Sequence, residues 1–497
     1  MKNDFKILFI YPNFTLSNAI LPAGISSLSA MLKKNGYTVR LFDTTLYSIN
    51  KITLDEIRES MYQIKKSSLD SRGITLKEEN VYEAFVKEVN SFRPNLIAVT
   101  VLEDTFGIAI SLLENLDKHI TTVAGGIYPT LNPEYVINDK YIDIICRGEG
   151  ELALLELCDN LYKGRAIGYI KNLWVKSNGK IYKNPPRELV NLDDLAFPDY
   201  SLFEEGRFYR PMQGRVLKML PIEIQRGCPY ACSYCADHSL NVIYKNQNQR
   251  YFRFKSAKIV ISEIKYYIEK YNAEYLYFNA ETFFAMPKKE FEIFASGYEK
   301  IKLPFWVQTR PETITEYYIK TLKDINCSNI NVGIEHGNEE FRKKVLKRNV
   351  SNEKIIEGLG IIRKYNIPVS VNNMIGFPDE TRELIFDTIK LNRQIEFTTT
   401  NAYIFYPYYG TELYEYCKKR NYLSSECIGF QGGEAYPYFS TRLNSPTISS
   451  EDLLGLQRTF VLYTKLHKDL WTEIRIAERF DEEGNSKYKE LCKKYLE

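Results

Sequence analysis

Short apolar runs alternate with amphipathic stretches along the first 165 residues, a pattern typical of an α/β domain. Between the first two runs, Ile25, Leu28 and Leu32 recur at helical spacing, and Gly36 follows where such a helix would end. The pattern predicts a doubly wound parallel sheet over residues 1–165. We expect its strands at Lys6–Tyr11, Tyr37–Phe42, Leu96–Val101, Thr121–Ala124 and Ile142–Cys146.

The pattern weakens over residues 166–210. Asn178-Gly179 between two apolar pieces predicts a small hairpin there, and Pro185-Pro186 predicts a linker after it. At the other end of the chain, residues 431–497 are aromatic-rich and then show helical spacing. They predict a small, mostly helical C-terminal region.

Strand and helix patterns resume over residues 211–430, in six successive pairs. Six such pairs predict a partial (β/α)6 barrel, an incomplete relative of the TIM barrel. Ser256 stands where it could cap one of the helices. We expect the barrel strands at Ile222–Gln225, Tyr275–Asn279, Phe305–Gln308, Ile330–Glu335, Val369–Ile375 and Thr400–Phe405.

The composition of the chain argues against nucleic-acid binding, a membrane span and a disulfide scaffold. The 497 residues include 66 Lys and Arg against 63 Asp and Glu, and a net charge of +3 gives no support for a nucleic-acid partner. Apolar runs are too short for a membrane span, and the N-terminus lacks the apolar core of a signal peptide, so we expect a cytoplasmic protein. Nine cysteines are too few for a disulfide scaffold, which directs attention to metal binding or catalysis.

Three of the cysteines, Cys228, Cys232 and Cys235, lie within eight residues, directly after the first expected barrel strand. Thiolates this close together select zinc or an iron-sulfur cluster. A structural zinc ion needs four ligands, and the nearest further candidate is His238. A 4Fe-4S cluster held by three cysteines leaves one iron open for a substrate or cofactor.

The CxxxCxxC spacing, with an aromatic residue before the third cysteine, resembles the radical S-adenosylmethionine (radical SAM) enzymes. The resemblance implies that SAM binds the open iron of a 4Fe-4S cluster and is cleaved reductively to a 5′-deoxyadenosyl radical. It also implies an electron donor such as flavodoxin or ferredoxin, and SAM contacts at the ends of the barrel strands. The expected SAM-binding residues are Tyr234, Glu281, Gln308, Arg310, Glu335 and Gly376.

The order of an α/β sheet and then this barrel resembles the cobalamin-dependent group of radical SAM enzymes, as do Gly125-Gly-Ile-Tyr-Pro129 and Arg147-Gly-Glu-Gly-Glu151. The resemblance implies a Rossmann-like cobalamin-binding domain and methyl transfer to carbon in a biosynthetic pathway, on a small-molecule or peptide substrate. No Asp-x-His-x-x-Gly motif occurs, so bound cobalamin would lack a lower histidine ligand. The expected cobalamin contacts are Asn13, Leu102, Glu103, Gly125, Gly126, Tyr128, Arg147, Gly148 and Glu149.

Three other functions compete with this hypothesis. One is a radical cyclisation, oxidation or rearrangement that needs no cobalamin. Another is a methylthiotransferase acting on RNA or protein, although such enzymes carry further N-terminal cysteines and here only Cys146 and Cys158 precede the triad. The third is a non-enzymatic iron-sulfur or zinc scaffold. We expect His336, after the fourth barrel strand, to be a hydrogen-bonded supporting residue rather than a proton donor.

Overall fold

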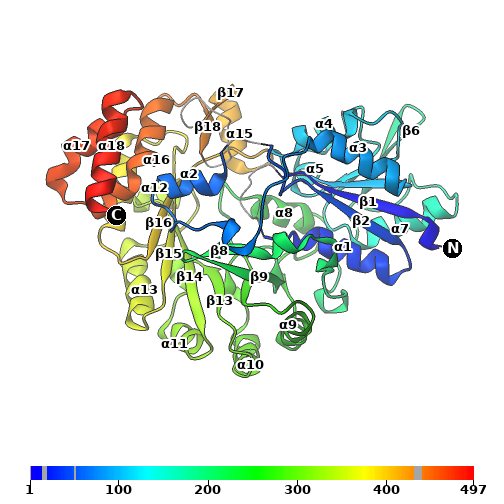
Figure 1. The fold of residues 1–497 in the computed structure, drawn as a ribbon, viewed down its shortest axis with the longest axis horizontal. Coiled ribbons are helices and arrows are strands. Elements are labelled where there is room, and N and C mark those ends of the chain that lie inside the picture. Colours follow the sequence, from blue (N-terminus) through cyan, green and yellow to red (C-terminus); the bar gives the residue numbers. More distant parts are fainter. Residues whose placement is uncertain (1, 14–19, 50–51, 430–438, 497) are drawn as a thin grey trace.

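The computed structural model describes residues 2–13, 20–49, 52–429 and 439–496 (Figure 1). The boundary expected at residues 430 and 431 therefore lies outside the described residues. The N-terminal unit holds a seven-stranded sheet in the order β2-β1-β3-β4-β5-β6-β7. Its strands are β1 Lys6–Tyr11, β2 Thr38–Asp43, β3 Leu96–Thr100, β4 Thr122–Gly125, β5 Ile144–Cys146, β6 Leu173–Ser177 and β7 Lys180–Lys183.

The five expected parallel strands are confirmed, and their pairing is parallel throughout. The hairpin expected at Asn178-Gly179 is also present, with both residues at positive φ, as a tight turn requires. Its strands do not stand apart from the sheet, because β6 pairs antiparallel with β5. The hairpin therefore completes the edge of the N-terminal sheet.

Alternating side chains of β1 explain why helices cover both faces of this sheet. Ile7 and Phe9 pack with Ile25 of one helix layer, whereas Leu8 and Ile10 pack with Phe85 of the other. The first layer contains α1 (Ala23–Lys34) and α7 (Glu151–Tyr162), which are in contact. The second contains α3 (Val81–Phe92) and α4 (Phe106–Glu114), and the short helices α5 (Ile127–Leu131) and α6 (Pro133–Asn138) follow β4. The doubly wound arrangement is thus confirmed.

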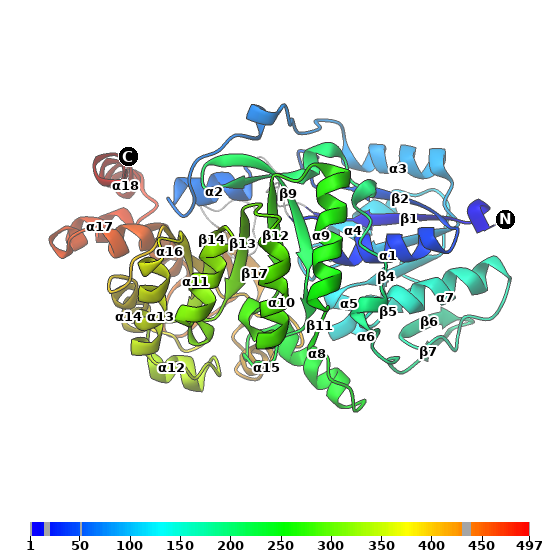
Figure 2. The same cartoon turned by 90° about the horizontal axis from the view of Figure 1, so that it is seen from below.

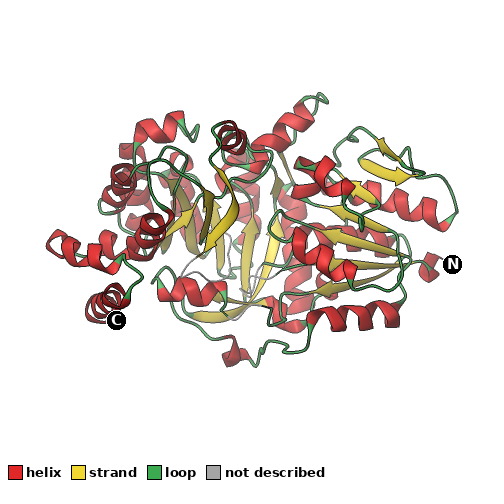
Figure 3. Cartoon of the chain, turned by 90° about the horizontal axis from the view of Figure 1, so that it is seen from above, coloured by secondary structure: helices red, strands yellow, loops and turns green. Residues whose placement is uncertain are grey.

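The second unit is a curled half barrel in the order β16-β15-β14-β13-β12-β9-β8 (Figure 3). Six strands are parallel, and β8 pairs antiparallel with β9. The first parallel strand starts earlier than expected, at Arg215. The strands are β8 Tyr209–Met212, β9 Arg215–Glu223, β12 Tyr275–Asn279, β13 Phe305–Thr309, β14 Cys327–Glu335, β15 Val369–Ile375 and β16 Thr399–Ile404.

Helices cover the outer face of the half barrel (Figure 2). Helix α9 begins after Ser256 as expected, but the hydroxyl of Ser256 makes no capping bond. Instead, the Glu290 carboxylate accepts a hydrogen bond from the Ala257 N–H at 2.9 Å. The helices are α8 Ala236–Lys245, α9 Ala257–Tyr271, α10 Lys288–Tyr298, α11 Glu316–Asp324, α12 Glu339–Lys344, α13 Asn352–Lys364, α14 Arg382–Asn392 and α15 Glu412–Lys419. Two small antiparallel pairs complete the unit: β10 (Gln225–Arg226) with β11 (Arg253–Phe254), and β17 (Leu423–Gly429) with β18 (Ser440–Leu443).

The C-terminal region is helical, as predicted, and its first helix is part of the barrel layer. Helix α16 (Ser450–Lys465) is buried along most of its length and packs on β16 and α14. It is followed by α17 (Trp471–Ala477) and α18 (Glu482–Tyr495), which pack on each other. None of the described helices is long and apolar enough to cross a membrane.

The segment between the two units ties them together. Tyr200 packs on Tyr267 of α9 and donates a hydrogen bond to the Pro221 carbonyl at 2.9 Å. On the other side, the Asp199 carboxylate accepts from Ser29 at 2.8 Å and pairs with Lys33 at 2.7 Å, both on α1. Burial opposes ionisation of Asp199, but Lys33 and the hydroxyl donors outweigh it and hold its pKa below the ordinary value.

We expect Asp199→Asn to lower the free energy of unfolding by about 1–3 kcal/mol near neutral pH. Because the folded pKa lies below the ordinary 3.8, this contribution is complete above that pH and is lost as the pH falls through the folded value. The two proteins should therefore converge in stability below about pH 4. Urea midpoints at several pH values measure this. Asp194→Asn, at an exposed neighbouring position, is the matched control, and a deficit that persists unchanged in acid would contradict the assignment.

Candidate active site

The three thiols lie on the loop that follows β9, at the carboxyl edge of the half barrel. The loop opens with Gly227 at φ +79°, where an added Cβ would lie 2.6 Å from the Tyr251 ring, so only glycine fits. Cys232 is buried, whereas Cys228 and Cys235 are partly exposed. The Cys228 Sγ atom lies 3.9 Å from the Thr282 hydroxyl, at the end of the next strand. The thiols thus occupy the edge where parallel barrels carry their active sites.

Burial keeps the Cys228 and Cys235 thiols protonated, because it raises the pKa of each. It raises the pKa of Cys228 to about 11, and burial together with the Asp237 and Glu281 carboxylates raises that of Cys235. Cys232 has a cationic neighbour, because Arg310 Nη1 donates to its Sγ atom at 3.2 Å while the guanidinium stacks on the Tyr230 ring at 3.7 Å. Thiolate ligation here must release protons, and Arg310 is placed to stabilise the negative charge that results.

The thiol loop suits a cluster better than a single ion. Among the residues that the structure describes, no three His, Cys, Asp or Glu side chains are close enough to hold one metal ion. In a 4Fe-4S cluster each cysteine binds a different iron, so the thiols need only surround a cube. Three thiols on one loop, with a guanidinium beside the buried one, fit that requirement.

Two acidic side chains face the thiol loop. Glu281, a predicted SAM contact after β12, is accessible from a cavity. The protein atoms around its carboxyl group displace water, and this desolvation together with the negative charge of Asp237 raises its pKa to about 7. Burial raises the pKa of Asp237, in the first turn of α8, to about 6. Sequence reasoning missed Asp237, although its position two residues after Cys235 could have pointed to it. A bound ammonium group would favour the ionised form of both carboxyls.

Two other predicted SAM contacts, Glu335 and Tyr234, are joined by an arginine that the sequence analysis did not single out. Arg348 Nη1 lies 3.1 Å from the Glu335 carboxylate and 3.2 Å from the Tyr234 hydroxyl, and its Nη2 donates to the Gly333 carbonyl at 2.6 Å. Glu335 itself ends β14 at φ +70°, an unusual backbone conformation for a glutamate. Gln308 lies half-buried near the end of the neighbouring β13.

Gly376, the last predicted SAM contact, lies in a tight turn after β15. Its φ is +79°, and an added Cβ would lie 2.6 Å from Leu453 of α16. Its N–H donates to the Glu380 carboxylate at 2.6 Å, and that carboxylate also contacts His336 Nε2 at 2.9 Å. His336 is fully buried, which matches the supporting role expected for it. SAM binding at Gly376 stays a prediction.

A cavity of about 350 Å³ lies between the two units, and we call it the interdomain cavity. Gly125, Gly126 and Gly148 line it from the N-terminal sheet, where the carboxyl ends of parallel strands commonly bind ligands. Asp237 and Glu281 line it from the barrel, beside the thiol loop. No histidine lines it in the described part of the chain, so a corrin held here would have to bind without an imidazole from these walls.

Other predicted cobalamin contacts lie elsewhere. Leu102, Glu103 and Tyr128 line a smaller cavity of about 200 Å³ beside Tyr408 and Tyr409, with the Glu103 carboxylate accepting from the Tyr409 N–H at 2.8 Å. These residues join the N-terminal sheet to the loop after β16. Cobalamin binding by them stays a prediction.

Asn13 and Arg147, two further predicted cobalamin contacts, make contacts within the N-terminal unit itself. The Asn13 amide donates to the Thr45 hydroxyl at 3.0 Å, and its N–H donates to Thr44 at 2.7 Å, which ties the end of β1 to the end of β2. Arg147 stacks on the Trp174 ring at 4.9 Å, and its Nε atom is buried without a hydrogen-bond partner in the described residues. Neither residue lines the interdomain cavity.

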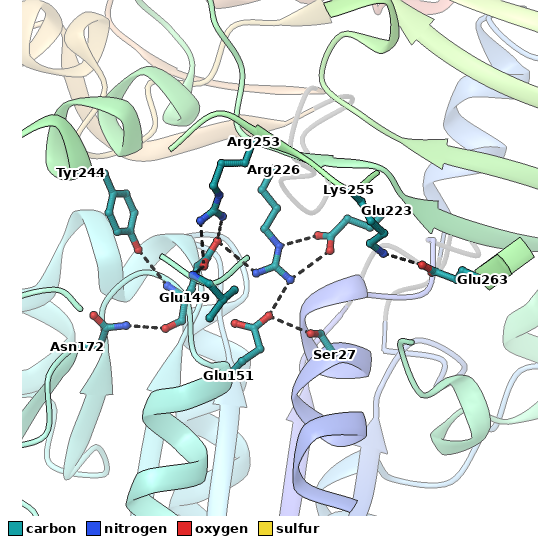
Figure 4. Close-up of polar contacts among 11 residues, drawn as sticks. Ser27, Glu149, Glu151, Asn172, Glu223, Arg226, Tyr244, Arg253, Lys255 and Glu263 are labelled. Carbon is teal, nitrogen blue, oxygen red and sulfur yellow. Dashed lines mark hydrogen bonds and ion pairs between the residues drawn. The ribbon is translucent and has the colours of Figure 1, made fainter. Parts of the chain in front are cut away.

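Glu149, the last predicted cobalamin contact, belongs to an ion network that joins the units (Figure 4). Arg226, two residues before Cys228, lies 3.3 Å from Glu149, 2.7 Å from Glu151 and 3.1 Å from Glu223. Arg253 pairs with Glu149 as well. Burial opposes ionisation of Glu151, but Arg226 holds its pKa below the ordinary value. The network thus fixes the thiol loop against the N-terminal unit.

Fold and site together define a class of enzyme, in which a thiol loop at the carboxyl edge of a half barrel faces an open α/β sheet across a shared cavity. The chain matches the Radical SAM superfamily over residues 222–391 and the B12 binding domain over residues 14–158. It belongs to the radical SAM superfamily, in the group that carries a B12-binding domain. Its cofactors are therefore a 4Fe-4S cluster, SAM and cobalamin.

Known proteins resemble the chain in sequence and in fold. The chain is 29% identical to an uncharacterized methyltransferase of Pyrococcus horikoshii, over 70% of this chain and 74% of the relative. It is 24% identical to the anaerobic magnesium-protoporphyrin IX monomethyl ester cyclase of Rubrivivax gelatinosus, over 82% and 69% of the two chains. The structure of the radical SAM methyltransferase TsrM from Kitasatospora setae, with cobalamin and a [4Fe-4S] cluster bound, matches at a TM-score of 0.62 with 16% identity, covering 89% of this chain and 80% of that one.

We expect Gly148→Ala to disturb the contact between the units. At φ +82°, an added Cβ would lie 2.0 Å from the Tyr244 hydroxyl, so the free energy of unfolding should fall by about 2–4 kcal/mol. Gly164→Ala, at φ +63° with open space around it, should cost only about 1 kcal/mol. Adding Tyr244→Phe removes the nearest atom and should restore part of the loss. Denaturant unfolding measures all four proteins, and equal losses at positions 148 and 164 would rule out the clash.

Replacing Arg226 should lower the free energy of unfolding more than Gly148→Ala does, because three carboxylates lose their shared cation. We expect Arg226→Gln to lower the free energy of unfolding by about 3–5 kcal/mol. Adding Glu151→Gln should recover part of this by removing an unpaired buried charge. Arg250→Gln, at an exposed position, should change stability by less than about 0.5 kcal/mol. Thermal unfolding and proteolysis of the segment between the units report these effects, and an Arg226 variant as stable as the control would refute the network's role.

Proposed function

We propose that this enzyme cleaves SAM reductively at a 4Fe-4S cluster held by Cys228, Cys232 and Cys235, and that it transfers a methyl group to a carbon atom of a small-molecule or peptide substrate in a biosynthetic pathway. The observation that carries the proposal is the interdomain cavity. Its two walls come from the B12-binding unit and from the thiol-bearing edge of the barrel. One cavity can therefore bring both cofactors next to one substrate.

The chain's own residues orient the cofactors and set the charge around them. When bound, the cluster and SAM supply a 5′-deoxyadenosyl radical, and cobalamin supplies the methyl group. Arg310 stabilises thiolate character at Cys232, and Glu281 with Asp237 offers carboxylates to the cationic SAM. Arg348 keeps Glu335 and Tyr234 in place at the end of β14. The glycines of the N-terminal edge leave room for a large planar ligand.

A radical cyclisation is the second candidate, because the cyclase relative covers more of this chain, 82%, than the methyltransferase relative, 70%. Both reactions begin with the same reductive cleavage of one SAM, which leaves its methyl group on methionine. Methyl transfer consumes a second SAM as the methyl donor to cobalamin, whereas cyclisation does not. Both also need an external one-electron donor, for which we propose a flavodoxin or ferredoxin. The eight cysteines whose side chains the structure describes are free thiols, which supports a reducing, cytoplasmic location.

The cluster assignment is tested by replacing all three cysteines with alanine in the full chain. Anaerobic reconstitution should load about four iron atoms per chain in the parent protein and almost none in the variant. With dithionite and SAM, 5′-deoxyadenosine should form only in the parent, because cleavage needs the cluster. Cys158→Ala, in the N-terminal core, should load iron like the parent. Continued 5′-deoxyadenosine formation in the triple variant would exclude these ligands.

The fate of the SAM methyl group separates the two candidate reactions. The full chain is reconstituted with iron, sulfide and hydroxocobalamin, desalted, and incubated with reductant and SAM labelled in its methyl group. Methyl transfer predicts near-stoichiometric corrinoid after desalting and label in the corrinoid fraction. Retained iron-sulfur absorption and 5′-deoxyadenosine without label in the corrinoid would favour cyclisation. An iron-sulfur scaffold that does not use SAM predicts an electron paramagnetic resonance signal unchanged by SAM.

A further inference from the structure

A second cavity, of about 290 Å³, lies inside the half barrel, and we call it the lumen cavity. Most of its lining residues on the parallel strands come from the first half or the middle of the strand. They include Tyr277 of β12, Trp306 of β13, Asn331 of β14, Asn372 of β15 and Asn401 of β16. The thiol loop and Glu281 follow the opposite ends of their strands. The lumen cavity is thus separate from the interdomain cavity and lies deeper in the barrel.

The lumen cavity has one apolar and one polar wall. Trp306 stacks on Tyr277 with ring centres 4.2 Å apart, next to Met219. Across from them, the inward positions of β14, β15 and β16 carry short polar side chains. These are Asn329, Asn331, Ser370, Asn372, Thr399 and Asn401. The interiors of such barrels are usually filled with branched apolar side chains, so a polar wall here suggests a ligand.

A segment from the N-terminal half of the chain covers this cavity. Helix α2 (Leu54–Ser60) lies beside the barrel strands, away from its own sheet (Figures 1 and 2). Its Ile57 packs in a cluster with Met61 and Tyr403 of β16. Arg58 and Gln63 from this segment, and Arg210 from β8, line the cavity. The segment around α2 therefore closes the lumen cavity and also adds polar groups to its lining.

Five buried polar atoms around the cavity lack a hydrogen-bond partner among the described residues. Two are donors, the Nε atoms of Arg58 and Arg210. Three are acceptors, Gln63 Oε1, Asn331 Oδ1 and Asn401 Oδ1. Gln63 and Asn401 are almost fully buried, at 0% and 4% exposure. Because buried polar groups are normally paired, so many unpaired atoms around one cavity indicate a bound partner with both acceptors and donors.

The charge of the lining selects an anion. The lining side chains carry three cations, Arg58, Lys65 and Arg210, against one anion, Asp55, and 3 − 1 leaves a charge of +2. Asp55 lies 3.5 Å from Arg58, which leaves Arg210 without an ion pair in the described residues. Burial lowers the pKa of Arg210 to about 10, so the group stays cationic at neutral pH but lacks a counter-charge. A carboxylate or phosphate group would supply the charge and the acceptors.

We propose that the lumen cavity binds an oxyanion group of the substrate, a carboxylate or a phosphate, at Arg210. This inference rests on the proposed function, since it places one end of the substrate at Arg210 while the other end reacts near the thiol loop. Asn331 precedes Glu335 by four residues on β14, a distance of about 13 Å along an extended strand. A substrate that reaches from the lumen cavity to the end of β14 is therefore an elongated polar molecule with an anionic end. Its hydroxyl or amide groups donate to Asn331 and Asn401.

Isothermal titration of the reconstituted full chain with inorganic phosphate, and separately with glutarate, tests this in low-salt buffer. At least one anion should bind saturably. Arg210→Gln should weaken that binding by about tenfold or more, the effect of losing one charged hydrogen bond. Arg215→Gln, an exposed arginine of the same hairpin, should change it less than about twofold. Asn401→Asp, which puts a carboxylate in the cavity, should also weaken binding and keeps the test valid if the Arg210 variant does not fold.

Each outcome decides the inference. Binding of phosphate alone or glutarate alone supports it and identifies the oxyanion. No saturable binding of either anion to the parent protein overturns it, because the cavity then holds only water. Binding that is unchanged in the Arg210 and Asn401 variants also overturns it. Formation of 5′-deoxyadenosine is measured in the same parent preparation. SAM cleavage without anion binding refutes this inference alone. Anion binding without SAM cleavage refutes the proposed function and the assignment of the anion to its substrate, and it leaves an anion site at Arg210.

Discussion

The buried guanidinium of Arg226 is the contact on which the arrangement of the two units depends. It lies between Glu149 and Glu151 of the N-terminal unit and Glu223 of the barrel. Removing an arginine and three carboxylates from water is costly, and close pairing repays that cost only while all partners stay in place. Because Gly227 and Cys228 follow directly in the chain, the same contact positions the thiol loop. Orientation of the units and geometry of the cluster site are therefore coupled.

That coupling limits how a substrate can enter. Opening the interdomain cavity by moving the units apart would separate Arg226 from Glu149 and Glu151, and would also pull Asp199 away from α1. Such a motion leaves several charges unpaired at once. The other mouth of the barrel is covered by the short helix α2, which packs there through a small cluster that includes Ile57 and Met61. Displacing this cover would break the hydrogen bond from Tyr488 to the Ser60 carbonyl and the packing of Ile57, and it would leave the Arg226 pairs in place.

The sequence predicted those parts of the fold that rest on local patterns. Strand positions, the Asn178-Gly179 hairpin and the thiol spacing depend on neighbours in the chain, and the structure places them within a few residues of expectation, apart from the earlier start of β9. Glu149, an expected cofactor contact, lines the interdomain cavity and also pairs with Arg226 and Arg253, more than 70 residues away in sequence. Asn13 and Tyr128 are expected cobalamin contacts too; the first hydrogen-bonds Thr45 after β2 and the second packs on Phe106, and cobalamin binding by them stays a prediction. Contacts between distant segments are not encoded in such patterns, and the same limit hid the contact of Arg348 with Tyr234.

The two faces of the barrel sheet show how stability and function are divided. Outward positions such as Ile330, Val332 and Val371 are fully buried against the helices, and they supply the apolar burial that stabilises the sheet. Inward positions one residue away, Asn331 and Asn372, add hydrogen-bonding groups to an enclosed lumen, where unpaired polar atoms cost free energy. Apolar side chains at those positions would make a more stable barrel. Some of these side chains pair across the strands, as Asn401 does with Asn372 and Thr399 with Ser370. The amide oxygens of Asn331 and Asn401 have no partner among the described residues, so recognition of a polar ligand explains them better than packing does.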